Sequence, residues 1–405
     1  MFKTIDGGIT APKGFTAGGV HCGIRKNKTK SDLAIIKADR LCTAAAVYTQ
    51  NLVKGSPIIV TQHNLENGFA QALICNSGNA NTCNADGEEK AKMMCEIAAE
   101  VCDVSALDVI VASTGVIGQI LPIEPIANAK EQLKASLSIN GSDEAAEAIL
   151  TTDTFKKMFA LEFTLNGKAC KIGGIAKGSG MIHPNMATML CFITTDVAIS
   201  SELLNKALHE VIEDTFNMVS VDGDTSTNDM VSVMASGAAE NEQITTENEN
   251  YNIFKNALYA MNESLSREIA RDGEGATKLL TCKVSGAIDK MNARKIAKSI
   301  ITSSLFKAAM FGEDANWGRA LCAIGYSGAS LSIDKVNLRF ASTAGEITVC
   351  ENGSGINFSE EKAAEILKAK EIEVIVTLED GEANATAFGC DLTYDYVKIN
   401  GDYRT

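Results

Sequence analysis

The chain has 405 residues, of which 45% are hydrophobic and 22% charged, a composition typical of a folded globular protein and too apolar for a disordered one. Fifty-one acidic residues against 37 basic ones give a formal charge of −14. A field of that sign repels phosphate backbones and anionic lipids, which disfavours nucleic-acid and membrane-surface roles. The length fits two or three domains.

The cysteine and histidine content argues against a disulfide framework and against a metal site. The twelve cysteines are scattered without a C-x-x-C pair, and the four histidines show no ligand spacing. The N-terminus has no apolar segment of the secretory type, and the longest charge-free runs are interrupted by Asn, Gly and Gln. We therefore expect a reduced, cytoplasmic protein that binds no metal, no nucleic acid and no membrane.

In chain order, short apolar runs alternate with helical patterns, which predicts a mixed α/β fold. Buried strands are expected at 57–60, 72–75 and 109–112, and a helix is expected from Ser142. The clearest helix is expected at 201–219, capped by Ser200 or Ser201, with one apolar face.

The second half continues the alternation. A helix is expected at about 359–370, a strand at 372–378, and a strand at 392–399 that anchors the C-terminal tail. From about residue 278 onward a new helix-and-strand series begins. We expect a domain boundary near residue 280, which divides the chain into an N-terminal catalytic domain, 1–280, and a C-terminal domain, 281–405.

Two loop-like motifs fail the tests for known binding loops. The glycine-rich stretch 171–181 has Ser179 where a phosphate loop needs Lys, and His183 where a dinucleotide turn needs its third Gly. The acidic run 222–229 lacks the Gly and Glu of a calcium loop. Tight turns therefore remain the simpler interpretation of both motifs.

A threonine can act as a nucleophile without histidine if it becomes an N-terminal residue, because its own α-amine then serves as the base. This requires the chain to cut itself before that threonine. Ala187 followed by Thr188 offers such a bond, although the Ala-Thr dipeptide is too common to be specific by itself.

The segment GSGMIHPNMATML at 178–190 resembles the self-cleavage segment of the ornithine acetyltransferase (glutamate N-acetyltransferase) family of arginine biosynthesis. The resemblance extends over nearly the whole chain. It includes GITAPKGF at 8–15, NSGNAN at 76–81, STGVIG at 113–118, TTDT at 151–154, DGDTSTND at 222–229, RDGEGATK at 271–278, GEDANWGR at 312–319 and the C-terminal segment 391–405.

The resemblance implies an N-terminal-nucleophile-like, self-cleaving fold with a smaller C-terminal α/β domain. Cleavage between Ala187 and Thr188 would give an α chain, 1–187, and a β chain, 188–405, assembled as an α2β2 heterotetramer. The resemblance makes Thr188 the nucleophile and assigns Thr114 and Gly115 to the oxyanion hole. The matching substrate-binding positions are Thr151 (with Thr152 as its nearest competitor), Lys177, Thr188, Glu274, Asn400 and Thr405.

The implied activity moves the acetyl group of N-acetylornithine to glutamate through an acetyl-Thr188 ester, in a ping-pong cycle. No cofactor is expected, and whether acetyl-CoA also serves as acetyl donor stays open. Two alternatives remain: an N-terminal-nucleophile aminopeptidase or amidase of the same architecture, which would pass the acyl group to water, and a non-catalytic acidic binding protein.

Overall fold

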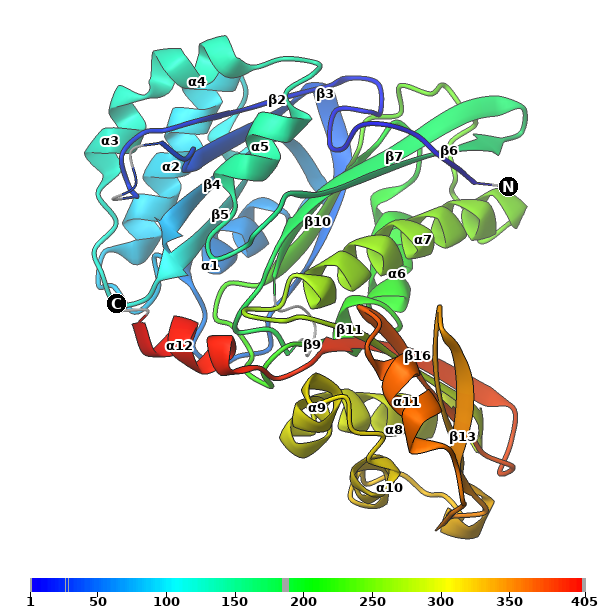
Figure 1. Cartoon of the computed structure of the whole chain (residues 1–405). Coiled ribbons are helices and arrows are strands. Elements are labelled where there is room, and N and C mark those ends of the chain that lie inside the picture. The colour runs from blue at the N-terminus through cyan, green and yellow to red at the C-terminus, as the bar shows by residue number, and fades with distance from the viewer. Residues whose placement is uncertain (1, 26, 28, 184–188, 403–405) are drawn as a thin grey trace.

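The computed structural model describes residues 2–25, 27, 29–183 and 189–402 and shows two β-sheets with helices packed on them (Figure 1). The first sheet has the strand order β1-β6-β7-β8-β10-β3-β4-β5, with β2 paired to β3. Its strands are β1 (Lys3–Thr4), β2 (Phe15–Val20), β3 (Leu33–Tyr48), β4 (Phe69–Asn79), β5 (Val109–Val116), β6 (Lys157–Leu165), β7 (Lys168–Lys177), β8 (Leu190–Thr195) and β10 (Met230–Ala235).

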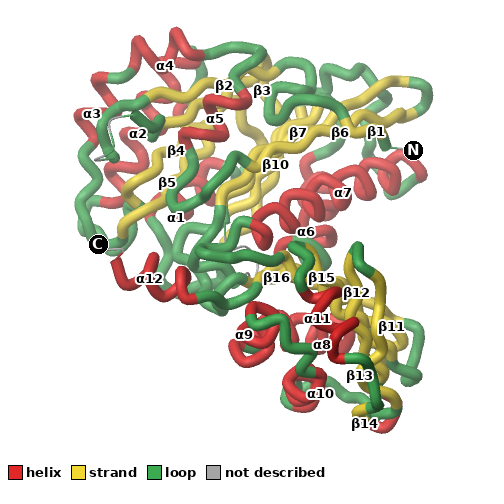
Figure 2. The backbone as a smooth tube through the Cα atoms, viewed as in Figure 1, coloured by secondary structure: helices red, strands yellow, loops and turns green. Residues whose placement is uncertain are grey.

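Seven helices pack on or beside the first sheet. They are α1 (Ser56–Asn64), α2 (Gly87–Cys102), α3 (Ile123–Asn128), α4 (Lys130–Ser136), α5 (Ser142–Ala148), α6 (Ser201–Ile212) and α7 (Glu249–Arg271). Helices α6 and α7 contact each other, and their apolar residues join those of β7, β8 and β10 in one core. Apolar residues of α1 and α2 join those of β4 and β5 in another core. Figure 2 shows these helices on either side of the yellow strands.

The second sheet has the order β14-β13-β12-β15-β11-β16-β9. Its strands are β9 (Val219–Ser220), β11 (Leu279–Ala287), β12 (Asn337–Ser342), β13 (Gly345–Glu351), β14 (Ser354–Gly355), β15 (Glu371–Thr377) and β16 (Ala383–Cys390). The helices beside it are α8 (Lys290–Thr302), α9 (Ser304–Phe311), α10 (Trp317–Gly325) and α11 (Glu360–Leu367), which share a separate core with these strands.

Besides the connection from α7 to β11, two segments cross between the regions of the two sheets. Strand β9 lies between β8 and β10 in sequence, yet it pairs with β16 in parallel, with Val219 opposite Phe388. After β16 the chain returns toward the first sheet as α12 (Tyr394–Asp402), coloured red in Figure 1. Apart from β9, the strands of the second sheet all lie at residue 279 or beyond. The division into domains at residue 280 stays a prediction.

Most predicted elements of the mixed α/β fold are present. Strands 72–75 and 109–112 lie within β4 and β5, the strand at 372–378 corresponds to β15, and the helix beginning at Ser142 is α5. The Ser200 hydroxyl accepts a hydrogen bond from Leu203 N and caps α6, and the Ser359 hydroxyl caps α11 in the same way. Helix α6 ends at Ile212, earlier than the residue 219 expected.

Two predicted strands are wrong, because each forms a helix. Residues 57–60 belong to α1, where Pro57 lies in the first turn and its fixed φ suits a helix start. A four-residue apolar run cannot by itself distinguish strand from helix. Residues 394–402 form α12, and Thr393 just before it donates to Gly275 O at 2.7 Å. No neighbouring strand pairs with this segment in the described part of the chain, so its β-branched residues have no sheet to join.

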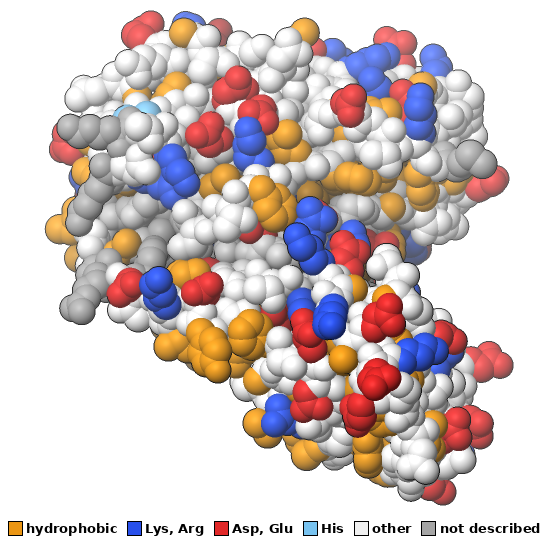
Figure 3. Space-filling model, viewed as in Figure 1, with side chains coloured by type: hydrophobic (Ala, Val, Ile, Leu, Met, Phe, Trp, Pro, Cys, Tyr) orange, Lys and Arg blue, Asp and Glu red, His pale blue; other side chains and the backbone are white. Residues whose placement is uncertain are grey.

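Figure 3 shows acidic and basic side chains interspersed over one face of the molecule. Among the described residues, no helix is both long and apolar enough to cross a bilayer.

Candidate active site

Strand β8 starts at Leu190, two residues after the predicted nucleophile, and lies between two paired neighbours. Leu190 is antiparallel to Lys177 of β7 and parallel to Met230 of β10. Ala187 and Thr188, like Thr405, lie outside the described residues, so their predicted roles stay predictions. The pairing of β8 nevertheless brings its first residue next to the last residue of β7 and the first residue of β10, just after the predicted cleavage site in sequence.

A cavity lies at this start of β8. Thr114 of β5 and Lys177 of β7, both predicted site residues, line it. The other described residues that line it come from the loop after β7, from the start of β8 with the residue before it, and from the segment before β10: Gly180, Met181, Ile182, Met189, Leu190, Ser226, Asn228 and Asp229. A residue from the predicted oxyanion hole and one from the predicted substrate set therefore share one space.

Gly115, the second predicted oxyanion-hole residue, occupies a conformation that favours glycine. Its φ is +132°, and a Cβ placed there would lie 2.4 Å from the carbonyl carbon of Gly78. The adjacent backbone is held by Asn228, whose amide donates to Ser113 O at 2.9 Å and to Ala80 O at 2.6 Å. Backbone at this point is thus both closely packed and fixed, as a preorganised donor requires.

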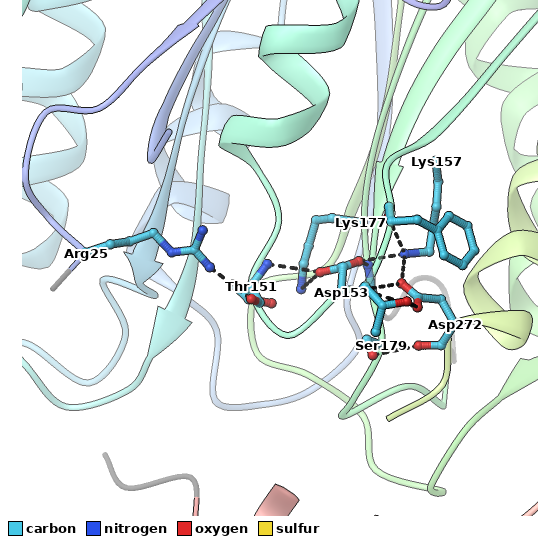
Figure 4. Close-up of polar contacts among 10 residues, drawn as sticks. Arg25, Thr151, Asp153, Lys157, Lys177, Ser179 and Asp272 are labelled. Atoms are coloured by element: carbon cyan, nitrogen blue, oxygen red, sulfur yellow. Dashed lines mark hydrogen bonds and ion pairs between the residues drawn. The ribbon is translucent and has the colours of Figure 1, made fainter. Parts of the chain in front are cut away.

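Asp153 links two predicted substrate-binding residues (Figure 4). Its Oδ2 accepts a hydrogen bond from Thr151 N at 3.0 Å and lies 4.0 Å from Lys177 Nζ. Its Oδ1 accepts from Gly178 N at 2.6 Å. Arg25 donates to the carbonyl of Thr151 at 2.9 Å, and its buried Nη1 has no hydrogen-bond partner among the described residues.

Lys157 neutralises this buried acidic centre. Its Nζ donates to Asp153 Oδ1 at 2.8 Å and to Asp272 Oδ2 at 2.6 Å, and it is 1% exposed. Burial by itself would raise the pKa of Asp153, but Lys177 and Lys157, with the hydrogen bonds, hold that pKa well below its usual range. Asp153 is therefore a carboxylate that positions both Thr151 and Lys177.

Glu274 and Asn400, from distant parts of the chain, are in direct contact. Asn400 Nδ2 of α12 donates to Glu274 Oε2 at 2.8 Å, and Glu274 N donates to Ser179 O at 2.9 Å. The Glu274 carboxyl packs so closely on Gly180 that a Cβ there would lie 2.3 Å from it. Since Gly180 lines the cavity, the Glu274–Asn400 pair lies at the edge of the same space.

His183 is not placed to act as a base at neutral pH. Burial, and then the charge of Lys298, lower the pKa of His183 to about 4. Its Nδ1 lies 3.1 Å from Ser220 Oγ, and its carbonyl accepts from Thr225 Oγ1 at 2.8 Å. The imidazole is thus neutral and fixed by local contacts. In the described part of the chain, no three His, Cys, Asp or Glu side chains are grouped so that they could hold a metal ion.

Sequence reasoning missed four charged residues of this region: Asp153, Lys157, Asp229 and Asp272. They come from three separate segments of the sequence, around residues 153–157, 229 and 272, and only their burial distinguishes them. Asp229 belongs to the acidic run interpreted as a turn. That run bends, with Asp224 N donating to Asp222 Oδ1 at 3.2 Å, and Asp222 also accepts from Met181 N and Ile182 N. Asp229 itself is 2% exposed, and its Oδ2 has no hydrogen-bond partner among the described residues.

The family model described as the ArgJ family matches residues 16–405 of this chain. The chain belongs to the ArgJ family. The arginine biosynthesis bifunctional protein ArgJ of Caldanaerobacter subterraneus subsp. tengcongensis is 50% identical over 404 residues, covering 100% of both chains. The protein of the same name from Bacillus subtilis is 47% identical over 403 residues, covering 99% of this chain and 97% of its own.

A solved member of the ArgJ family, the arginine biosynthesis bifunctional protein from Bacillus halodurans, is 47% identical with a TM-score of 0.50. The match covers 98% of the solved chain but 52% of this one, so the solved chain is about half as long as the one described here. The family membership confirms the resemblance seen in the sequence, and the helices and sheets of the structure confirm the mixed α/β class of fold. The roles of individual residues remain predictions.

Proposed function

We propose that this chain transfers the acetyl group of N-acetylornithine to glutamate through an ester on Thr188. One observation carries the proposal: the six described residues assigned from the sequence (Thr114, Gly115, Thr151, Lys177, Glu274 and Asn400) are joined through shared contacts around the start of β8. The names of full-length relatives, which place them in arginine biosynthesis, agree with this activity.

In the first half-reaction Thr188 Oγ attacks the acetyl carbonyl carbon while its proton passes to the α-amine of the same residue. The oxyanion is stabilised by the Gly115 N–H and the Thr114 hydroxyl, donors whose individual removal typically costs about 3–4 kcal/mol of barrier. Ornithine then leaves, and glutamate attacks the ester in a second half-reaction through the same oxyanion.

Substrate recognition follows from charge. Both substrates carry an α-carboxylate, which suits the Lys177 ammonium held at the cavity by Asp153. They differ at the far end, where ornithine has an ammonium and glutamate a carboxylate. Glu274, only 9% exposed, favours the ornithine ammonium, and Asn400 can donate to either substrate.

The proposal includes self-cleavage between Ala187 and Thr188, because only a free α-amine makes Thr188 its own base. An N→O acyl shift requires a hydroxyl on the residue after the scissile bond. The length of the solved relative, about half of this chain, is consistent with two processed chains. The proposal also includes assembly of the 1–187 and 188–405 chains as an α2β2 heterotetramer, a division into domains 1–280 and 281–405, and a cytoplasmic location.

Intact-mass measurement of the purified protein combined with a transfer assay tests the proposal. Wild type should give two chains starting at Met1 and Thr188, and should acetylate glutamate from N-acetylornithine. Thr188→Ser should still cut, whereas Thr188→Ala should remain one chain without transfer. Two fragments with the same new N-terminus from Thr188→Ala would contradict the mechanism.

The acetyl donor is tested separately. Relatives are named bifunctional, and we extend the proposal to acetyl-CoA as a second donor. Glutamate acetylation from acetyl-CoA alone would support this second activity, and its absence would restrict the enzyme to recycling the acetyl group. Release of acetate in the absence of glutamate, at the rate of transfer, would favour the aminopeptidase or amidase alternative.

A further inference from the structure

The contacts of the buried Asp229 carboxyl group do not explain a structural role for it. It lines the same cavity as Thr114 and Lys177, it is 2% exposed, and its Oδ2 lacks a hydrogen-bond partner among the described residues. Burying a polar atom without a partner costs free energy, so such a group is retained at a cost to stability. The cavity has a volume of about 20 Å³, enough for one water-sized group, so a single polar atom of a bound molecule would supply the missing partner there.

The strand register places Asp229 beside the start of β8. Met230, the next residue, pairs with Leu190 and donates its N–H to Met189 O at 2.9 Å. Neighbouring strands lie about 4.8 Å apart, so the Asp229 backbone is one strand spacing from the residues that begin β8. Thr114, the predicted oxyanion-hole residue, also lines this cavity.

The surroundings of Asp229 favour its protonated form. Burial raises the pKa of Asp229 well above its usual range, and hydrogen bonding from Ser226 and the charge of Lys177 oppose this only in part. Among the described residues, Lys177 of β7 is the charged side chain that affects the pKa of Asp229. The other described residues that line the cavity, from β5, from β8 and from the segment before β10, are uncharged. A carboxyl group whose pKa is raised by burial is suited to general acid catalysis.

We infer that Asp229 is a further catalytic residue, the general acid that protonates the leaving nitrogen of N-acetylornithine and the base that receives a proton from the attacking nitrogen of glutamate. The inference rests on the proposed acetyl transfer. It assigns separate proton carriers to the two bonds that change: the α-amine of Thr188 serves the threonine oxygen, and Asp229 serves the substrate nitrogen.

The proton balance closes over both half-reactions. When the oxyanion collapses, the C–N bond breaks, its electron pair stays on nitrogen, and that nitrogen takes the Asp229 proton, leaving a carboxylate. Ornithine departs as a free amine and glutamate arrives as one, each exchanging its ammonium proton with water. As the glutamate nitrogen attacks the ester, it returns a proton to Asp229, while Thr188 Oγ leaves with the proton held by the α-ammonium.

Two acetyl donors that differ in their leaving group separate this role from a structural one. An amine leaves only with a proton, whereas p-nitrophenolate leaves without one. General acid–base catalysis contributes about 10²–10⁴-fold. For Asp229→Asn we therefore expect kcat/KM with N-acetylornithine to fall at least about a hundredfold, while acylation by p-nitrophenyl acetate stays within about fivefold of wild type.

Asp196→Asn is the matched control. Asp196 is also buried, at 1% exposed, and burial raises its pKa as well, but it lies just beyond the other end of β8 and accepts hydrogen bonds from Lys171 N and Lys13 N. It should affect both donors equally. Because Asp196 has backbone partners and Asp229 Oδ2 has none, Asp196→Asn should lower the unfolding midpoint and Asp229→Asn should not.

A measurement on wild type supports the test if Asp229→Asn does not fold. The ratio of kcat/KM for N-acetylornithine to that for p-nitrophenyl acetate should fall as pH rises through the pKa of Asp229, because only the amine donor needs the acid. A pH-independent ratio, an equal loss for both donors in Asp229→Asn, or a folded Asp229→Asn chain that stays uncut would each overturn the inference. Wild type that is cut but transfers no acetyl group would instead refute the proposed function.

Discussion

Loss of the Lys157 ammonium is predicted to destabilise the first sheet. This ammonium is buried and donates to Asp153 Oδ1 at 2.8 Å and to Asp272 Oδ2 at 2.6 Å. Lys157→Met keeps most of the side-chain volume and removes the charge. Two buried carboxylates then face each other without the cation between them.

The expected cost follows from what each carboxylate retains. Removing one partner of a buried ion pair typically costs about 3–5 kcal/mol. Asp153 keeps the N–H groups of Thr151 and Gly178 and the charge of Lys177, and Asp272 keeps the N–H and hydroxyl of Thr154. We therefore expect a loss of about 3 kcal/mol, toward the lower end of that range.

The assay is urea unfolding followed by far-UV circular dichroism. Fluorescence is a poor probe here, because the single tryptophan, Trp317, lies in α10 beside the second sheet. Lys156→Met is the matched control, since Lys156 is the preceding residue and pairs with Asp143 on the surface. An exposed pair contributes at most about 1 kcal/mol, so Lys156→Met should differ little from wild type.

The deficit of Lys157→Met should depend on pH in one direction. In wild type the depressed pKa of Asp153 contributes stability that is present above about pH 4, the unfolded value, and is lost as pH falls further. Without Lys157 the buried carboxyl takes up a proton at higher pH, which relieves the uncompensated charge. The difference in unfolding free energy should therefore be largest near pH 7 and shrink toward pH 4.

Adding Asp272→Asn to Lys157→Met removes one of the two uncompensated charges and should restore part of the stability. Two results would refute the reasoning about this network. One is a Lys157→Met protein within 1 kcal/mol of wild type at pH 7; the other is a deficit no larger than that of Lys156→Met.

Three further predictions concern the site. Gly115→Ala should lower the rate of acetyl transfer at least about a hundredfold, because its Cβ would meet Gly78. Gly118→Ala is the control, because Gly118 also has a positive φ but open space around it, and it should cost little activity. Similar losses in both variants would argue against a role for Gly115. Glu274→Gln should raise KM for N-acetylornithine more than KM for glutamate, measured in separate half-reactions, and an equal change would remove Glu274 from side-chain selection. His183→Ala should still be cleaved before Thr188 and keep acetyl transfer within about tenfold of wild type. Its pH profile above pH 5 should be unchanged, since a pKa of about 4 leaves the His183 imidazole neutral there. A thousandfold loss would show that His183 acts as a base.

Local sequence patterns predicted correctly those elements that are defined by residues within one short segment. The apolar face of α6, the Ser200 and Ser359 caps and the alternation of β15 are readable because helix and strand periods are properties of a short segment. Where a segment is short or its composition is mixed, the tertiary surroundings decide, as they do for α1 and α12. Motifs along the whole chain also sufficed to identify the family.

The composition of the site, by contrast, is a product of the tertiary structure. Lys157 and Asp272 are 115 residues apart in sequence, and Asn400 and Glu274 are 126 apart. Nothing in the sequence distinguishes Asp229 from the acidic residues beside it in the same turn, of which Asp222 accepts backbone hydrogen bonds. The parallel pairing of β10 with β8 carries Asp229 into the interior next to Lys177 and Thr114, where burial raises its pKa. The burial of each site residue and the charged groups near it depend on which strands pair. Strand order is a long-range property, so the periodicity of a short segment cannot predict it.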